Sequence, residues 1–92
     1  MQAIWNNKVI AESNETIVTE GNHYFPVESV NKNYLVESEH ISFCPWKGKA
    51  SYFSLLVDGK LNTNAVWYYP ETKDAAKEIE GRLAFWNGVT VK

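Results

Sequence analysis

The segment Cys44-Pro45-Trp46-Lys47-Gly48 brings a thiol, an indole and an ammonium group close together. Proline and glycine interrupt regular structure, so the segment should leave a strand and form a loop. Loops carry binding residues disproportionately, and a tryptophan beside a lysine can line a pocket for a flat or anionic ligand. The alternative is structural, with Trp46 filling the end of a barrel and Gly48 allowing the chain to turn. Packing is the more frequent use of aromatic side chains.

Cys44 has the chemistry of a nucleophile, but only where a neighbouring cation or base produces its thiolate. Lys47 is a nearby cation, and His23 and His40 are the only histidines. Their separation in sequence places neither histidine beside the thiol. A free cysteine is commonly a small buried hydrophobic residue, and this is the favoured interpretation. No catalytic residue is therefore assigned.

The sequence predicts no metal site and no other cofactor. Zinc needs three or four protein ligands, usually from paired cysteines or histidines. The only residues of these two types, His23, His40 and Cys44, form no CxxC, HxH or HExxH motif. Carboxylates could complete a set of ligands, but nothing in their spacing indicates one.

Two carboxylates and an aromatic run extend the set of candidate binding residues. Glu28 follows the strand-like segment Tyr24-Phe25-Pro26. It can act as a general base at the mouth of a barrel, or lie in solvent in the first turn of a short helix. Glu12 lies near the end of another predicted strand, so its side chain can face either side. The run Val66–Pro70 places large rings on both faces of one strand. One face must pack in the core, and the other face is either covered by a helix or open to a ligand.

The chain has 92 residues, which is room for one domain, assigned to residues 1–92. Its net charge is −2 and it has a single arginine, whereas nucleic-acid-binding proteins normally carry a basic patch, so no nucleic acid is expected. One cysteine cannot form an internal disulfide, which favours a reducing compartment. The N-terminus does not resemble a signal peptide, and no apolar run is long enough to span a membrane. We therefore expect a cytoplasmic protein that does not contact a membrane.

Turn signals recur roughly every eight to twelve residues, as is typical of antiparallel β proteins. The pairs Asn6-Asn7, Asp58-Gly59 and Asn87-Gly88 predict tight hairpin turns, the last of which would join two closing strands. Residues Val27–Val30 are predicted to form a single helical turn. The predicted strands are Gln2–Trp5, Val9–Ser13, Thr16–Glu20, His23–Phe25, Tyr34–Ser38, Lys49–Val57, Leu61–Tyr69, Leu83–Trp86 and Val89–Val91.

One short C-terminal helix is predicted over Lys73–Ile79. Thr72 is its expected N-cap, and Gly81 stands where a left-handed residue commonly ends a helix. Ala75, Ala76 and Ile79 share one helical face, so the helix should cover a sheet. The predicted fold class is mainly β (α+β), a meandering antiparallel sheet curled into a partial barrel or sandwich with this helix against it.

Five motifs occur in order along the chain: Ala11-Glu12-Ser13, Tyr24-Phe25-Pro26, Cys44-Pro45-Trp46-Lys47-Gly48-x-Ala50-x-Tyr52, Ala65-x-Trp67-x-Tyr69-Pro70 and Ile79-x-Gly81-Arg82-x-Ala84-Phe85. Together they resemble the family known as domain of unknown function 427, sometimes given a nucleotidyltransferase label. The resemblance covers essentially the whole chain. It implies a small β-rich domain, mostly bacterial, that stands alone or is fused to copies of itself. It implies no established activity.

The residues do not support the nucleotidyltransferase label. Nucleotidyl transfer needs metal ions held by clustered carboxylates, and usually a glycine-rich loop for the phosphates. The only aspartates, Asp58 and Asp74, lie in a predicted turn and a predicted helix start. The chain contains neither a GxxxxGK[ST] nor a DxD motif.

Polar groups within the family motifs are the ones that a core does not require, and they indicate a candidate site. The predicted ligand is small and polar or anionic, held in an aromatic-lined pocket near the CPWKG segment with Lys47 as its anion contact. If the site is catalytic, Glu12 or Glu28 would act as acid or base. The alternative function is a structural or protein-interaction domain, whose sheet edges could form a homo-oligomer. The candidate site residues are Glu12, Tyr24, Glu28, Trp46, Lys47, Tyr52, Trp67 and Tyr69.

Overall fold

Three antiparallel sheets make up the fold, and a computed structural model describes all of residues 1–92. The largest has the order β5-β6-β7-β8, the second has the order β2-β1-β9, and β3 and β4 form the third. The strands are β1 Gln2–Trp5, β2 Lys8–Glu12, β3 Ile17–Thr19, β4 Asn22–Tyr24, β5 Leu35–Cys44, β6 Gly48–Val57, β7 Lys60–Tyr68, β8 Leu83–Phe85 and β9 Thr90–Val91. The prediction of a mainly β, antiparallel fold is confirmed, although the sheets do not close into a barrel.

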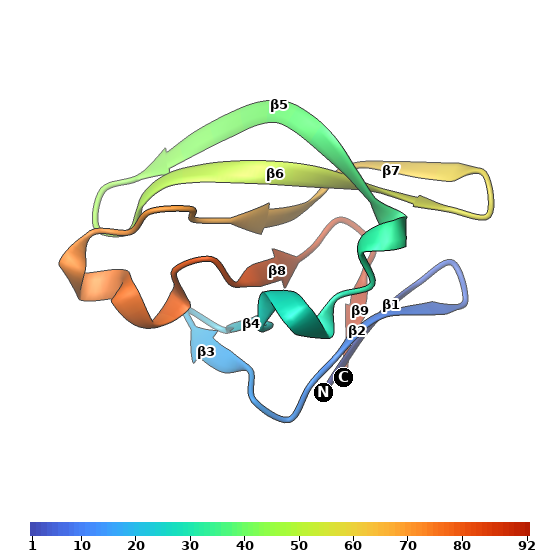
Figure 1. Ribbon diagram of the computed structural model, residues 1–92, viewed down its shortest axis with the longest axis horizontal. Coiled ribbons are helices and arrows are strands. Elements are labelled where there is room, and N and C mark those ends of the chain that lie inside the picture. Colours follow the sequence, from blue (N-terminus) through green and yellow to red (C-terminus); the bar gives the residue numbers. More distant parts are fainter.

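The long strands β5, β6 and β7 arch over the two smaller sheets (Figure 1). An isolated bridge between Phe25 and Leu83 joins the end of β4 to β8, and another between Ala11 and Val30 holds the segment after β4 against β2. Three short 3-10 helices connect the strands: η1 Val27–Ser29, η2 Lys32–Tyr34 and η3 Asp74–Ile79. None of the helices is long and apolar enough to cross a membrane.

The hydrophobic core has two parts. The larger part contains Phe25 and Phe85, whose rings meet edge to face with 5.4 Å between their centres. The smaller part lies where η3 meets the large sheet, and it forms the base of the candidate site described below. Its buried members are Tyr24, Ala50, Tyr69, Ala76, Ile79 and Ala84.

Local turn chemistry explains two of the predicted hairpins. Asn6 and Asn7 have φ values of 50° and 64°, and they join β1 to β2. Asp58 and Gly59 have φ values of 50° and 79°, and they join β6 to β7. Consecutive positive φ angles are what a tight hairpin turn requires, and asparagine, aspartate and glycine adopt them most readily.

The predicted closing hairpin is wrong. Asn87 and Gly88 do have positive φ angles, of 57° and 91°, but β8 pairs with β7 and β9 pairs with β1. The side chain of Asn87 explains the difference, because its Nδ2 donates to Oδ1 of Asn62 on β7. The turn is thereby fixed to the large sheet, and the chain after it crosses to the other sheet.

Strand β5 is twice the length of the predicted strand Tyr34–Ser38, and Tyr34 itself lies in η2. A register shift between Glu37 and Ile41 interrupts its pairing with β6. Polar residues fill this irregular stretch, so the sequence loses its strand pattern there although the strand continues to Cys44.

The predicted C-terminal helix is a kinked 3-10 segment instead of an α-helix. Ala76 has non-helical backbone angles. Of the three residues expected on the buried face, Ala76 and Ile79 are buried and Ala75 is exposed. Thr72 is not the N-cap, since its hydroxyl donates to Oε1 of Glu80. Contacts from outside the segment fix its start, because the N–H of Lys73 donates to the carbonyl of Lys47 at 3.0 Å.

Gly48 lies close against the start of this segment. Its φ of +117° lies outside the range that residues with a Cβ adopt, and a Cβ there would come within 3.3 Å of the carbonyl oxygen of Glu71. The turn between β5 and β6 therefore requires glycine in order to lie against residues 71–73.

We predict that Gly48→Ala lowers the free energy of unfolding by about 1–3 kcal/mol, because it combines backbone strain with a close contact. Gly59→Ala is the matched control. Gly59 has a φ of +79° with no atom near the position of the added Cβ, so it should lose less stability. Urea denaturation of both variants measures the difference, and an equal loss would contradict this account of Gly48.

Candidate ligand-binding site

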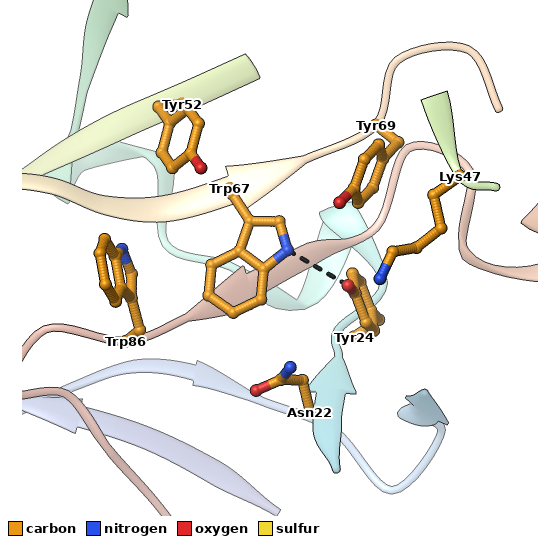
Figure 2. A pocket seen from close by; sticks show the side chains of 7 residues that line it. All are labelled: Asn22, Tyr24, Lys47, Tyr52, Trp67, Tyr69 and Trp86. Atoms are coloured by element: carbon orange, nitrogen blue, oxygen red, sulfur yellow. Dashed lines mark hydrogen bonds between the residues drawn. The ribbon is translucent and has the colours of Figure 1, made fainter. Parts of the chain in front are cut away.

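A pocket of about 250 Å³ opens beside the turn between β5 and β6. Side chains from β4, β6 and β7, and from the segments that follow β5, β7 and β8, surround it (Figure 2). Aromatic rings form most of its wall, and one lysine provides the only charged group in the lining. The lining residues are Asn22, Tyr24, Lys47, Tyr52, Trp67, Tyr69 and Trp86.

Lys47 reaches this pocket from the tight turn that follows β5. Cys44 and Gly48 are paired across the ends of β5 and β6, which turns the residues between them back over the sheet. The side chain of Lys47 is only 7% exposed, and Lys47 is the only charged residue among the buried ones. Its ammonium group forms an ion pair with the carboxylate of Glu20, in the turn between β3 and β4.

Two aromatic rings also lie against the ammonium group. Nζ of Lys47 is 4.9 Å from the ring centre of Trp46 and 5.7 Å from that of Tyr69. Aromatic faces carry negative electrostatic potential, so both rings stabilise the charge. Trp46 therefore lies over the lysine, and it neither lines the pocket nor plugs the end of a barrel.

These surroundings keep Lys47 protonated. Burial alone would lower the pKa of Lys47, but the hydrogen bond to Glu20 and the nearby phenol groups outweigh it, and the net pKa is raised above 10.5. The hydrogen bond from Lys47 holds the pKa of Glu20 below its usual value of 4.5. A permanently charged ammonium group can bind an anion, whereas a lysine that acts as base or nucleophile must first lose its proton.

Specific contacts hold the aromatic rings of the pocket wall in place. Nε1 of Trp67 donates to the hydroxyl oxygen of Tyr24 at 3.2 Å, and the two rings meet edge to face at 6.1 Å. Trp86 meets Trp67 edge to face at 6.4 Å. The hydroxyl group of Tyr52 shares a hydrogen bond of 2.9 Å with that of Ser42. These contacts fix the orientation of the rings before any ligand arrives.

A comparison with known protein families identifies the family of this chain. The family model described as a domain of unknown function, DUF427, matches residues 1–92. The chain belongs to this family. The short name of the model refers to NTP transferases, while its description states that the function is unknown. No curated protein matches the chain.

Several residues of the motifs on which the family resemblance was based converge on the pocket. Five residues from three separate motifs line this one cavity (Figure 2). They are Tyr24, Lys47, Tyr52, Trp67 and Tyr69. Two other motif residues have structural positions instead. Gly48 turns the chain, and Ala84 is fully buried in the core.

Two of the predicted site residues lie elsewhere. Glu12 is exposed at the end of β2, where its carboxylate accepts a hydrogen bond from Gln2. Glu28 is exposed in η1. Neither lines the pocket, because β2 and η1 turn these side chains toward solvent. The carboxylate near the pocket is that of Glu20.

Sequence reasoning missed Glu20, Asn22 and Trp86. Glu20 and Asn22 flank Gly21, and this turn was the only local signal that they share one end of a hairpin. Trp86 follows β8, so its placement depends on how β8 pairs with β7. No pattern within the sequence gives that pairing.

Cys44 packs against the smaller part of the core, partly buried beside the pocket wall. His40 stacks edge-on against Tyr52, and Nδ1 of His23 shares a hydrogen bond with the hydroxyl of Thr16. Neither contact involves the thiol. No group of three or more His, Cys, Asp or Glu side chains lies close enough together to hold a metal ion.

A second hollow has a volume of about 360 Å³. It is lined by Lys49, Ser51, Pro70 and Glu71 and has no aromatic wall. Lys49 is exposed, in contrast to the buried Lys47. The smaller, aromatic pocket is therefore the better candidate site.

The phenol group of Tyr69, which lines the pocket, should lose its proton only at high pH. Burial raises the pKa of Tyr69 to about 12 from its ordinary value of 10.0, although Lys47 opposes the shift. Between these pH values the unfolded chain releases the Tyr69 proton while the folded protein holds it, so we predict that stability falls as the pH rises through this window. Absorbance at 295 nm should reveal one late-titrating phenol, absent from Tyr69→Phe. A difference between the two curves that lies near pH 10 instead of near pH 12 would contradict the assignment.

Proposed function

We propose that this protein binds a small anionic ligand in the aromatic pocket, with Lys47 as the anion contact. One observation carries the proposal, namely that a lysine ammonium group is buried at the wall of a pocket otherwise lined by aromatic and polar uncharged side chains. Burying a charge is unfavourable, so a structure retains one where it has a partner or a use.

The character of the available donors supports an anionic ligand. Lys47 stays protonated, and the phenol of Tyr69 keeps its proton to about pH 12. The hydroxyl of Tyr24 accepts from Trp67 and retains its own proton to donate. The pocket therefore presents a cation and hydroxyl donors, and this combination recognises acceptor oxygens of carboxylate or phosphate groups.

The proposal names no reaction. None of the pocket residues is a carboxylate, and the one carboxylate nearby, Glu20, is paired with Lys47. The candidate acid or base residues Glu12 and Glu28 face solvent on other elements. Binding alone is the function that these contacts support.

We predict that an anionic ligand at about a hundred times its dissociation constant raises the melting temperature by on the order of ten degrees. The measurement is a thermal-shift screen with small carboxylates, sugar phosphates, nucleoside monophosphates and uncharged amide analogues. Lys47→Met, which keeps the apolar stem and removes the charge, should abolish the shift.

Lys49→Met is the control, since it removes the same charge from the neighbouring hollow. It should preserve the shift. The proposal fails if no anion stabilises the protein, or if Lys47→Met responds like the wild type. Loss of the shift in Lys49→Met alone would show that the ligand binds in the second hollow instead.

A second candidate function, self-association, is favoured by the exposed surface of β5. This strand is an edge of the large sheet, and Phe43 on it is 74% exposed while Ile41 is 45% exposed. An apolar edge strand is a template for pairing with another chain. Phe43 lines neither hollow, so changing it leaves the proposed ligand contacts intact.

For this second function we predict a mass by light scattering that rises with concentration above the 10.5 kDa of one chain. Phe43→Thr keeps a residue that favours strands and removes the apolar ring, so it should hold the mass at that of a monomer. A wild-type mass that stays at the 10.5 kDa of one chain at every concentration would exclude self-association through β5.

A further inference from the structure

The pocket has two chemically different ends (Figure 2). Lys47 and the hydroxyl groups of Tyr24 and Tyr69 lie at one end, and Trp86 lies at the other, beyond Trp67. Both indole N–H groups donate within the chain, Trp67 to Tyr24 and Trp86 to the carbonyl of Asn64. The rings of Trp67 and Trp86 therefore offer carbon surface, beside the polar groups of Asn22 and Tyr52, while the lysine end offers hydrogen-bond donors.

Glu20 already places a carboxylate at the lysine end. Its side chain is 54% exposed, whereas that of Lys47 is 7% exposed, so the cation is built into the pocket and the anion approaches from solvent. Glu20 lies at the tip of the β3–β4 hairpin, which is attached to β8 at its other end through the bridge between Phe25 and Leu83. Because more than half of the Glu20 side chain is exposed, its carboxylate can move into solvent and another carboxylate can take its place beside the ammonium group.

The charge and volume of the pocket limit the ligand. Lys47 is the only cation in the lining, which matches one negative charge better than the two of a phosphate monoester. The pocket volume of about 250 Å³ lies below the range of roughly 300–1,000 Å³ typical of sites for larger ligands. A single ring with one anionic group is the size that these limits favour.

We infer that the ligand is a carboxylic acid with one aromatic ring, whose carboxylate replaces that of Glu20 at Lys47 and whose ring contacts Trp67 and Trp86. This inference rests on the proposed function and specifies its ligand class. Trp67 already makes edge-to-face contacts with Tyr24 and Trp86, at interplanar angles of 90° and 86°. A further ring extends this cluster, whereas an aliphatic group gains only the burial of its surface.

The test is a ¹H–¹⁵N NMR titration of the 92-residue chain with four probes: benzoate, cyclohexanecarboxylate, benzamide and phenyl phosphate. Benzoate should shift the indole N–H resonances of Trp67 and Trp86. It should bind about two- to ten-fold more tightly than cyclohexanecarboxylate, which has the charge but no aromatic ring. It should bind at least about ten-fold more tightly than benzamide, which has the ring but no charge.

The variants test the role of the ion pair. Lys47→Met should abolish benzoate binding while the spectrum remains that of a folded protein. Glu20→Gln removes the carboxylate that competes for the ammonium group, so it should tighten benzoate binding by up to about five-fold, a small gain because the Glu20 side chain is already 54% exposed. An unchanged or weaker affinity in Glu20→Gln would overturn the replacement of Glu20 by the ligand.

The remaining outcomes separate this inference from the proposed function. If cyclohexanecarboxylate binds as tightly as benzoate, or if phenyl phosphate binds more tightly, the inferred ligand class is wrong and anion binding at Lys47 stands. If benzamide binds as tightly as benzoate, or if none of the probes and none of the anions in the thermal-shift screen binds, the proposed function itself fails.

Discussion

The buried ammonium group of Lys47 is the constraint on which the candidate site depends. No other buried residue of the chain carries a charge, and a charge without partners in that position would be strongly unfavourable. Its partners come from three separate places, with Glu20 on a small hairpin, Trp46 in the same turn and Tyr69 after β7. One charge thus links the two-stranded sheet to the large sheet, and the pocket lies where they meet.

The sequence predicts those features of the fold that depend on local chemistry. The turns at Asn6-Asn7 and Asp58-Gly59 were predicted because their positive φ angles are a property of the residues themselves. Asn87-Gly88 has the same local chemistry and the same sign of φ, yet it joins strands of different sheets. Hydrogen bonds from distant strands decide that outcome, and no short window of sequence contains them.

The residues of the candidate site also divide into those that the local sequence indicates and those that depend on contacts between distant segments. The family motifs indicated Tyr24, Lys47, Tyr52, Trp67 and Tyr69, and these residues do line one pocket. Glu12 and Glu28 were included because a strand or a helical turn can present a carboxylate to either side, and here both face solvent. Glu20 was missed because it is paired with a residue 27 positions further along the chain. An ion pair between distant segments leaves no local pattern.

The pairing of β1 with β9 has a consequence for how the chain is synthesised. Ala3 is paired with Val91, so the central strand of the three-stranded sheet lacks one neighbour until the ribosome has released residues 90 and 91. Contacts between such distant residues are slow to form because a long loop must close first. During translation β1 therefore presents an open edge toward other nascent chains. Its hairpin partner β2 can cover only the opposite edge in the meantime.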